Sequence, residues 1–414
     1  MKKAKRRSLF WGLAVLASLA SCSDRDGDKK VVLPELELTA EEMAVATTVN
    51  NSEIDMFRDF AKTIKVTEED LAMRSPNLGF SPLSASMAIS MLANAVGDDD
   101  AAKLSEILGV DNLAALNAYN TKLLNYLPYQ EEGNVLKLAN AMWYQSGRPI
   151  DASFSQTVSK IFGSVPSPLD FAGNPEGAIN AINRWVSNNT GGMIDDFAHS
   201  GSCNSAMSLF LANALYYEGL WDRPFEKKNT SDKPFYNGTE NLSVPTMNRE
   251  GGYYYYENEG IEMVSLPFKG LRQELFVILP PEGTDVREFS CGFGSAEFDE
   301  LLSTGRPMKL DFYMPKFKIN KLVDISPYLT SKGVESQMLN LVKANLGCYN
   351  TLIQQKNVFE VDEDGAKLAS VTGNGYVSSP GIDGVYRIDR PFVYILRDVS
   401  GSVLIAGWVN NPLK

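Results

Sequence analysis

The sequence contains a single histidine among 414 residues, and this scarcity excludes several kinds of active site. A Ser-His-Asp or Cys-His hydrolase, or a metal site built from several histidines, would have to use His199. A general base formed by His199 with Asp195 or Asp196 is the one catalytic alternative. We interpret His199 instead as a loop residue that follows a helix ended by Gly191. The motifs for nucleotide binding, zinc hydrolysis and a nucleophile elbow are also missing, so we expect neither a catalytic residue nor a cofactor.

The chain has no surplus of basic residues and no obvious metal-ligand cluster. Its formal net charge is −12 and its pI is near 4.8, whereas nucleic-acid binding requires a basic surface. The run Asp362–Gly365 resembles the start of a calcium loop, but it lacks the later acidic positions and the closing glutamate. We therefore expect no nucleic-acid partner and no bound metal.

Cysteines are too few and too scattered for a disulfide framework. Besides Cys22, the chain has Cys203, Cys291 and Cys348, with no CxxC spacing. We interpret these three as buried free thiols, and a single disulfide among them is the alternative.

No apolar run is long enough to span a membrane. The run Leu9–Leu19 follows a cap of five basic residues and ends at small residues before Cys22, which resembles a bacterial lipoprotein signal. An ordinary secretory signal is the alternative. We expect residues 1–21 to be the signal, Cys22 to carry the lipid and residues 22–38 to form a tether. Removal of the signal leaves a net charge of about −17, so the lipid alone would hold the protein on the outer membrane, at the cell surface or on the periplasmic face.

The remainder of the chain has the pattern of one α+β domain. Thr39–Glu42 is a capping box that opens a helix, and Ser81 followed by Pro82 is typical of a helix start before the apolar run 85–95. Strand-like runs dominate later and end in a hairpin of residues 392–396 and 403–409. With no internal repeat and no long linker, residues 39–414 are expected to form a single domain.

Two further segments have an unusual composition. Tyr253–Tyr256 is a run of four aromatics; strand alternation would bury two and expose two, which leaves open a glycan-binding platform. Residues 365–387 are small and flexible and lie between two predicted strands, yet residues 366–372 contain no proline or glycine. That first half therefore has strand potential.

Five stretches, in the correct order over residues 40–414, resemble elements of the serpin family of protease inhibitors. They are Asn77–Ser84, Ile182–Val186, Leu211–Phe225, Phe359–Ala366 and Arg390–Pro412. The resemblance implies a fold with three β-sheets, one of them large and mobile, about nine helices, and an exposed reactive centre loop at about 365–388. It also implies that a protease attacks the loop, forms an acyl-enzyme and is trapped when the loop inserts into the large sheet.

The resemblance assigns roles to individual residues. The hinge of the loop comprises Glu363, Gly365, Ala366, Leu368, Ser370 and Thr372. The last four of these would turn inward on insertion by the strand period, and Leu368 is bulkier than the family usually has there. The polar cluster beneath the opening sheet, the shutter, comprises Ser81, Ser84, Asn213 and Gln355, the last in place of the family's usual histidine. Trp221 matches the tryptophan at the top of the sheet, the breach.

The scissile bond lies within a short stretch of the loop. Family spacing puts the residue before the cut at Ser379, or at Pro380 when counted back from Pro391; with Ser379 before the cut, Pro380 would follow it and disfavour cleavage there. Cleavage after Tyr376, Val377 or Ser378 therefore competes. No Arg or Lys lies between Leu368 and Ile382, so the expected target is an elastase-, chymotrypsin- or papain-like protease.

From these motifs we expect a monomeric, non-enzymatic inhibitor of a serine or cysteine protease, anchored by a lipid. The alternative within the fold is a non-inhibitory member that is cleaved as a substrate, which Leu368 favours.

Overall fold

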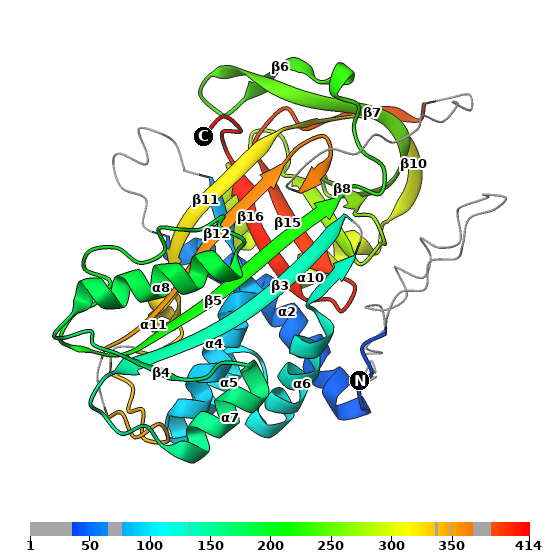
Figure 1. The fold of residues 1–414 in the computed structure, drawn as a ribbon. Coiled ribbons are helices and arrows are strands. Elements are labelled where there is room, and N and C mark those ends of the chain that lie inside the picture. Colours follow the sequence, from blue (N-terminus) through cyan, green and yellow to red (C-terminus); the bar gives the residue numbers. More distant parts are fainter. Residues whose placement is uncertain (1–34, 65–76, 132, 336–337, 348–349, 367–381) are drawn as a thin grey trace, which may run out of the picture.

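The computed structural model describes residues 35–64, 77–131, 133–335, 338–347, 350–366 and 382–414 (Figure 1). In these ranges it confirms the α+β class: a large twisted sheet lies against a second, bent sheet, and helices pack around them. Nine α-helices are present in the described part. They are α2 (Ala40–Thr63), α4 (Pro82–Ala95), α5 (Asp98–Ile107), α6 (Leu113–Tyr126), α7 (Ala152–Phe162), α8 (Pro175–Asn189), α9 (Val286–Gly292), α10 (Ser295–Leu302) and α11 (Ser326–Ser331).

The large sheet has seven strands in the order β11-β12-β13-β5-β3-β2, with β4 also paired to β3. It mixes parallel and antiparallel pairs, since β12 runs parallel to β5 while β3 runs antiparallel to it. The bounds are β11 (Phe317–Asp324), β12 (Asn350–Val361), β13 (Gly365–Ala366), β5 (Met207–Leu220), β3 (Asn134–Gln145), β2 (Tyr129–Glu131) and β4 (Ser167–Leu169).

The second sheet has nine strands in the order β1-β16-β15-β9-β8-β7-β10-β14, with β6 also paired to β7. Its 18-residue strand β7 belongs to two parts: it pairs with β8 near its end, and with β6 and β10 along its length. The described strands therefore form two hydrogen-bonded sheets where three were expected, because β7 pairs with β8 as well as with β6 and β10. The bounds are β1 (Leu78–Phe80), β6 (Ser231–Tyr236), β7 (Asn241–Asn258), β8 (Ile261–Pro267), β9 (Gln273–Leu279), β10 (Arg306–Pro315), β14 (Gly384–Arg387), β15 (Phe392–Asp398) and β16 (Val403–Val409).

Helix starts follow the predicted capping signals. The Thr39 hydroxyl accepts a hydrogen bond from the Glu42 backbone N–H, and the Glu42 carboxylate accepts one from the Thr39 N–H, so the capping box is present. Ser81 caps α4, and Pro82 occupies its first turn. All residues of α4 are buried, as expected for a helix that is apolar on every side.

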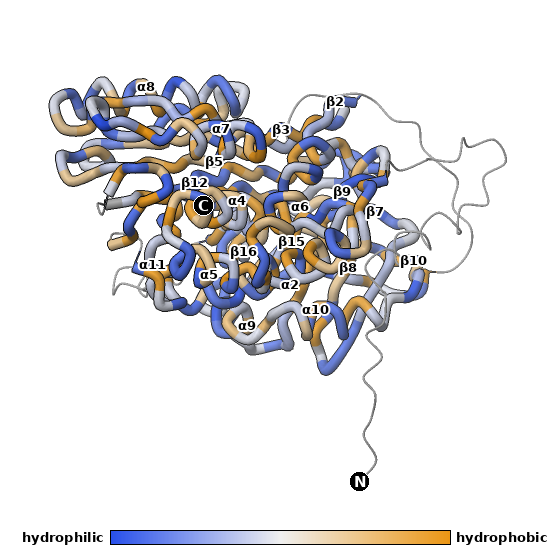
Figure 2. The backbone as a smooth tube through the Cα atoms, turned by 90° about the horizontal axis from the view of Figure 1, so that it is seen from below, coloured by the Kyte–Doolittle hydropathy of each residue, from blue (hydrophilic) through white to orange (hydrophobic). Residues whose placement is uncertain are grey.

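A smaller second core lies on one face of the seven-stranded sheet, under α8. The helix crosses this face in Figure 1, and its residues alternate between hydrophilic and hydrophobic in Figure 2. The apolar side of α8, which includes Ile182 and Val186, packs with Phe210 of β5 and with Phe197 and Cys203 of the segment after the helix. The sheet is therefore covered on both faces, which explains why its strands read as nearly continuous apolar runs.

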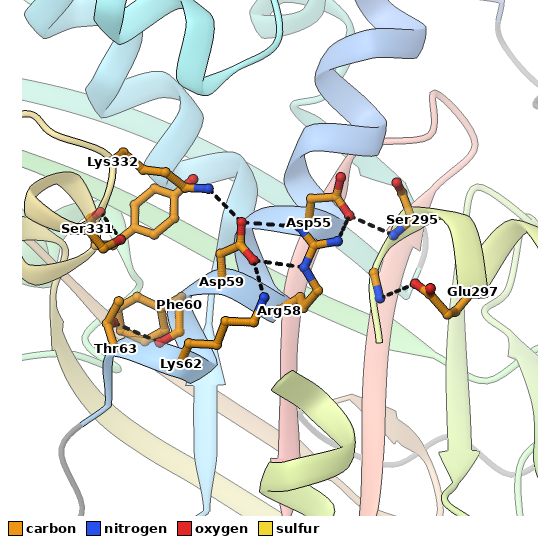
Figure 3. Close-up of polar contacts among 12 residues, drawn as sticks. Asp55, Arg58, Asp59, Phe60, Lys62, Thr63, Ser295, Glu297, Ser331 and Lys332 are labelled. Carbon is orange, nitrogen blue, oxygen red and sulfur yellow. Dashed lines mark hydrogen bonds and ion pairs between the residues drawn. The ribbon is translucent and has the colours of Figure 1, made fainter. Parts of the chain in front are cut away.

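A half-buried charge network fastens α2 to two other helices (Figure 3). The Asp59 carboxylate accepts hydrogen bonds from Arg58, from Lys62 at 2.9 Å and from Lys332, just after α11, at 2.6 Å. Asp55 accepts from Arg58 and from the backbone N–H of Ser295 at the start of α10. Burial acts to raise the pKa of Asp59, but the three cations outweigh burial and lower it.

The expected exposure of two tyrosines in Tyr253–Tyr256 is wrong. Tyr253, Tyr255 and Tyr256 are buried, and Tyr254 is half-buried. Both faces of β7 are covered here, because Tyr253 packs on Phe312 while Tyr256 packs on Phe276. This run offers no exposed platform to a glycan.

Candidate functional site

The short strand β13 (Gly365–Ala366) lies between β12 and β5 at one end of the seven-stranded sheet, and we call it the wedge. Ala366 pairs antiparallel with Val361 of β12 and with Gly219 of β5, and Gly365 pairs with Leu220. Lower down, β12 and β5 pair with each other directly, from Thr351↔Leu209 to Gln354↔Ala212. Between these two regions, residues 355–360 of β12 and 213–218 of β5 have no pairing with each other in the described part of the sheet. The sheet is thus joined where β12 and β5 begin, which we call its bottom, and split toward the ends of these strands, which we call its top.

Gly365 is required where β13 meets β5. A Cβ atom on this residue would collide with the backbone carbonyl oxygen of Gly219 and lie 2.8 Å from the Cα of Leu220. The backbone of the hinge therefore approaches β5 more closely than any side chain allows, which accounts for the glycine predicted to begin the hinge.

Trp221 lies directly against the wedge. Its indole N–H donates to the carbonyl oxygen of Asp362 at 2.9 Å, and its backbone N–H donates to that of Asp364 at 3.0 Å. The ring stacks on Phe268 with centroids 4.4 Å apart. Trp221 therefore connects the end of β5 to the turn between β12 and β13.

The carboxylates of the three acidic residues in that turn each form ion pairs or hydrogen bonds with neighbouring groups. Asp364 forms an ion pair with Lys227 at 2.8 Å. The buried Glu363 carboxylate accepts from Lys316 at 2.9 Å and from the Thr230 hydroxyl at 2.8 Å. Burial acts to raise the pKa of Glu363, but the hydrogen bonds to its carboxylate outweigh burial and lower it. Asp362 accepts from the backbone N–H groups of residues 364 and 365. We call this turn, with the side chains that bind it, the hinge clamp.

The four predicted shutter residues meet in one buried hydrogen-bond chain, although they come from three separate elements. Ser81 donates to the Ser84 hydroxyl at 2.8 Å, and Ser84 donates to Asn213 of β5 at 2.5 Å. Gln355 of β12 both accepts from the Ser81 backbone N–H at 2.6 Å and donates to the Ser81 carbonyl at 3.2 Å. An amide thus performs both hydrogen-bonding functions at the position that is usually histidine.

Several members of these clusters were missed by sequence reasoning. Asn140 of β3 accepts from Asn213 at 2.7 Å, and Asn357 of β12 donates to Gln355 at 2.9 Å. Lys316 and Thr230 of the hinge clamp were also missed. A signal was present for Asn140, a polar residue between apolar neighbours of β3, which a buried network explains. Asn357 follows three polar residues of β12 and carried no such signal.

Other predicted residues lie elsewhere. Leu368, Ser370 and Thr372, the scissile-bond candidates Tyr376, Val377, Ser378, Ser379 and Pro380, and the lipidation site Cys22 fall outside the described residues. His199 is an exposed loop residue beside Ser202, and Asp196 pairs with Lys356 instead. Cys203 is a buried free thiol, as predicted, and burial raises its pKa to about 11. Cys291 is also free, but it is half-buried and not buried as predicted, and Cys348 lies outside the described residues. Within the described ranges, no group of His, Cys, Asp and Glu could hold a metal ion, and no helix is long and apolar enough to cross a membrane.

Comparison with known proteins agrees with this geometry. The family model "Serpin (serine protease inhibitor)" matches residues 58–412. Neuroserpin of Homo sapiens is 25% identical over 396 residues, covering 91% of this chain and 95% of neuroserpin. Iripin-2 of Ixodes ricinus is 29% identical over 354 residues, covering 81% and 88% of the two chains. A split sheet, a wedged hinge and this family match define the chain as a serpin: it belongs to that family, whose members are mostly protease inhibitors that act on target proteases.

Solved structures show the same fold at low sequence identity. The thermophilic serpin Tengpin in its native state matches this chain with a TM-score of 0.79 and 22% identity, covering 92% of this chain and 96% of Tengpin. Human thyroxine-binding globulin, complexed with its hormone, has a TM-score of 0.78 with 20% identity, covering 90% and 100%. The fold thus also occurs in a protein that is named for binding a hormone.

Proposed function

We propose that this protein is a suicide-type inhibitor that traps a serine or cysteine protease by inserting its cleaved loop between β12 and β5. The observation that carries the proposal is the wedge itself: β13 has already entered the top of the split and is paired with both strands. The unpaired segments below it supply open backbone donors and acceptors for a longer strand.

Continuing the register of β13 gives each inward residue of the inserted loop a definite position. Leu368 would lie between Phe359 and Tyr217. Two residues further each time, Ser370 would reach Asn357, and Thr372 would reach the shutter between Gln355 and Asn213. Thr372 would thus meet two polar side chains, whereas Ser370 would have Asn357 on one side and Leu215 on the other. Leu368 would meet two buried aromatic rings. This agreement in polarity supports insertion as the fate of the cleaved loop.

The size of Leu368 affects whether the protein acts as an inhibitor or is cleaved as a substrate. Two aromatic neighbours must separate to admit its side chain, and slow insertion would let the protease complete hydrolysis before it is trapped.

The test of the proposed function is a panel of elastase-, chymotrypsin- and papain-like proteases, with the products separated on denaturing gels. An inhibitor gives a covalent band at the summed mass, whereas a clean cut without adduct at every enzyme ratio would overturn the proposal. Sequencing the released fragment identifies the scissile bond among residues 376–380.

The matched variants are Leu368→Thr and Val371→Thr. The first removes bulk from a residue that would face the core on insertion, and we expect it to raise the ratio of adduct to cleaved product. The second changes a residue that would face the opposite side of the sheet and should leave this ratio nearly unchanged. Equal effects of the two would contradict the register above.

We also propose that Cys22 is lipidated and holds the mature protein on the outer membrane. The proposal rests on the basic cap, the short apolar run and the small residues before Cys22. Cys22→Ser should release the protein from the membrane fraction, and protease added to intact cells then distinguishes surface from periplasmic display of the wild-type protein. Continued sedimentation of Cys22→Ser with membranes would contradict lipid anchoring.

A further inference from the structure

Two carboxylates face each other across the split just below the wedge. Ala366 is level with Val361 of β12 and Gly219 of β5, and Val361 and Ala366 belong to the large core. One residue further into the split, the facing residues are Glu360 of β12 and Glu218 of β5. Because successive residues of a strand point to opposite faces, both carboxylates lie on the face of the sheet that is turned away from the large core.

Charges on the neighbouring strands leave this level of the sheet one positive charge short. Glu360 forms an ion pair with Lys318 of β11, with 3.2 Å between the charged atoms. Glu218 accepts a hydrogen bond from the hydroxyl of Tyr216 at 2.6 Å, and it has no ion pair with any residue that the structure describes. Both glutamates are only partly exposed, so salt and solvent screen their charges less than those of fully exposed groups. The row of Lys318, Glu360 and Glu218 therefore carries one net negative charge.

The gap between the two glutamates has the width of one strand. β13 pairs with β12 on one side and with β5 on the other, and neighbouring strands lie about 4.8 Å apart, so β12 and β5 are separated by roughly 10 Å beside the wedge. Below the wedge, the facing edges of residues 355–360 and 213–218 have no strand partner within the described ranges. Two open backbone edges at this spacing accept an extended peptide segment, and this holds independently of the carboxylates. The ligand that fits both features is a strand with a cation at the level of Glu218 and Glu360.

We propose that Lys367 is that cation and that it is a positioning residue for the insertion of the cleaved loop. Lys367 lies outside the described residues, but it follows Ala366 directly in the chain, and it is the only charged residue from 366 to 382. In the register of β13 it enters between Glu218 and Glu360. The row then reads Lys318, Glu360, Lys367 and Glu218, with alternating signs and no net charge.

The ion pairs of Lys367 favour the inserted strand over the free loop. Opposite charges directly across neighbouring strands stabilise a sheet, and Lys367 would have such a neighbour on each side. Because Lys367 is the first residue to enter after the wedge, these pairs form at the start of insertion and shorten the time in which the protease can complete hydrolysis. This inference rests on the proposed function, since it concerns how the cleaved loop inserts.

The test is a set of charge reversals at Lys367 and Glu218, measured as the ratio of adduct to cleaved product with the protease of the panel that reacts fastest. Lys367→Glu places three carboxylates side by side, and we expect the ratio to fall about fivefold. Glu218→Lys should lower the ratio in the wild type, where it repels Lys367, but raise it in Lys367→Glu, where it supplies a counter-charge. Lys160→Glu, which reverses an exposed lysine of α7, is the control and should leave the ratio unchanged.

Salt provides a readout that a purely steric role of these residues would not change. At an ionic strength of about 1 M the screening length is about 3 Å, so the effects of the reversals should shrink at least twofold. An effect of Lys367→Glu that is as large in about 1 M salt as in about 0.1 M salt overturns the electrostatic role. An effect of Glu218→Lys with the same sign in both backgrounds overturns the placement of Lys367 beside Glu218.

The melting temperature of the cleaved protein separates this inference from the proposed function. If a protease cuts the loop but no adduct forms, the trap is overturned, and the rise in melting temperature after cleavage still decides the role of Lys367. That rise should be smaller by roughly 2 °C in Lys367→Glu than in the wild type, and addition of Glu218→Lys should restore part of it. Equal rises in the wild type and Lys367→Glu overturn the role of Lys367. If no protease cuts the loop, or if the cleaved wild type shows no rise, loop insertion and the role of Lys367 fail together.

Discussion

At the scale of single residues, hydroxyl groups on one buried helix differ sharply in what they contribute. Ser84 Oγ donates to Asn213 and accepts from Ser81, whereas Ser90 Oγ, equally buried on α4, has no partner among the described residues. Removal of a bonded hydroxyl leaves its partners buried and unsatisfied, and removal of an unbonded one does not. The contribution of a buried serine therefore depends on its partners and hardly on its burial.

Ser84→Ala is thus expected to lower the free energy of unfolding by about 1–3 kcal/mol, because Asn213 and Ser81 each lose a partner. Ser90→Ala is the matched control on the same helix and should be neutral or slightly stabilising. Urea unfolding monitored by tryptophan fluorescence measures both. Equal destabilisation by the two variants would show that the shutter chain contributes nothing beyond packing.

Glu53 provides a pH-dependent prediction. This fully buried carboxyl accepts from Ser86 and from the Val403 N–H, and burial raises its pKa to about 7, as it does that of Glu274. Because the folded pKa lies above the ordinary 4.5, its stabilising effect is complete below pH 4.5 and is lost as the pH rises through 7; the difference amounts to about 3 kcal/mol.

We therefore expect stability to fall between pH 5 and pH 8, and Glu53→Gln to remove part of that fall. Glu274→Gln should remove another part, while Glu360→Gln, which alters a half-buried carboxylate paired with Lys318, should leave the pH dependence as it is. Melting temperatures across this pH range are the measurement. Parallel curves for the wild type and Glu53→Gln would contradict the raised pKa.

At the scale of elements, the turn between β12 and β13 determines whether β13 stays between β12 and β5. It is held by side chains from three separate segments, namely Lys316, Trp221 and the pair Lys227 and Thr230. The wedge itself contributes only two residues of strand pairing, so these side chains, rather than the ladder, keep β13 in place.

Glu363→Lys should release the wedge, because it breaks a buried ion pair and places a second cation against Lys316. The expected loss is about 3 kcal/mol, together with rapid proteolysis at the hinge. Glu360→Lys breaks the neighbouring exposed pair with Lys318 and should cost less than about 1 kcal/mol. Thermal unfolding and limited proteolysis report both effects; similar losses in the two variants would rule out a clamping role for Glu363.

At the scale of the whole molecule, the large sheet is incomplete in the state described here. Among the described residues, strand segments 355–360 and 213–218 do not pair with each other, so their facing backbone edges have no strand partner there. The proposed insertion of the cleaved loop therefore implies that a kinetic barrier, and not the depth of its free-energy minimum, holds the uncleaved state.

Cleavage of the loop is accordingly expected to stabilise the molecule. Insertion of a strand worth several kcal/mol should raise the melting temperature by roughly 5 °C, since unfolding entropy grows with chain length. Thr372→Arg is the control, since an arginine cannot be buried between Gln355 and Asn213; this variant should be cleaved without the rise. A wild-type protein whose melting temperature does not change after cleavage would favour the non-inhibitory alternative.

The sequence alone determined those features that depend on neighbouring residues. The capping box at Thr39, the helix start at Ser81 and the buried run of α4 follow from local hydrogen bonding and periodicity, and the structure agrees with each. The family motifs also indicated the fold and the order of its elements. A wrong expectation arose where alternation was read without knowledge of the opposite face: Tyr254 and Tyr256 lie on a side of β7 that other elements cover.

Only the tertiary structure decided which distant residues meet. Glu363 with Lys316, Asn140 with Asn213, and Ser81 with Gln355 are joined across large separations in the chain, and no local pattern specifies such pairs. The single histidine, from which the exclusion of familiar hydrolase sites followed, proved to be an exposed loop residue. The proposed insertion therefore depends on backbone edges, a glycine contact and buried amides, whose arrangement exists only once the sheets have assembled.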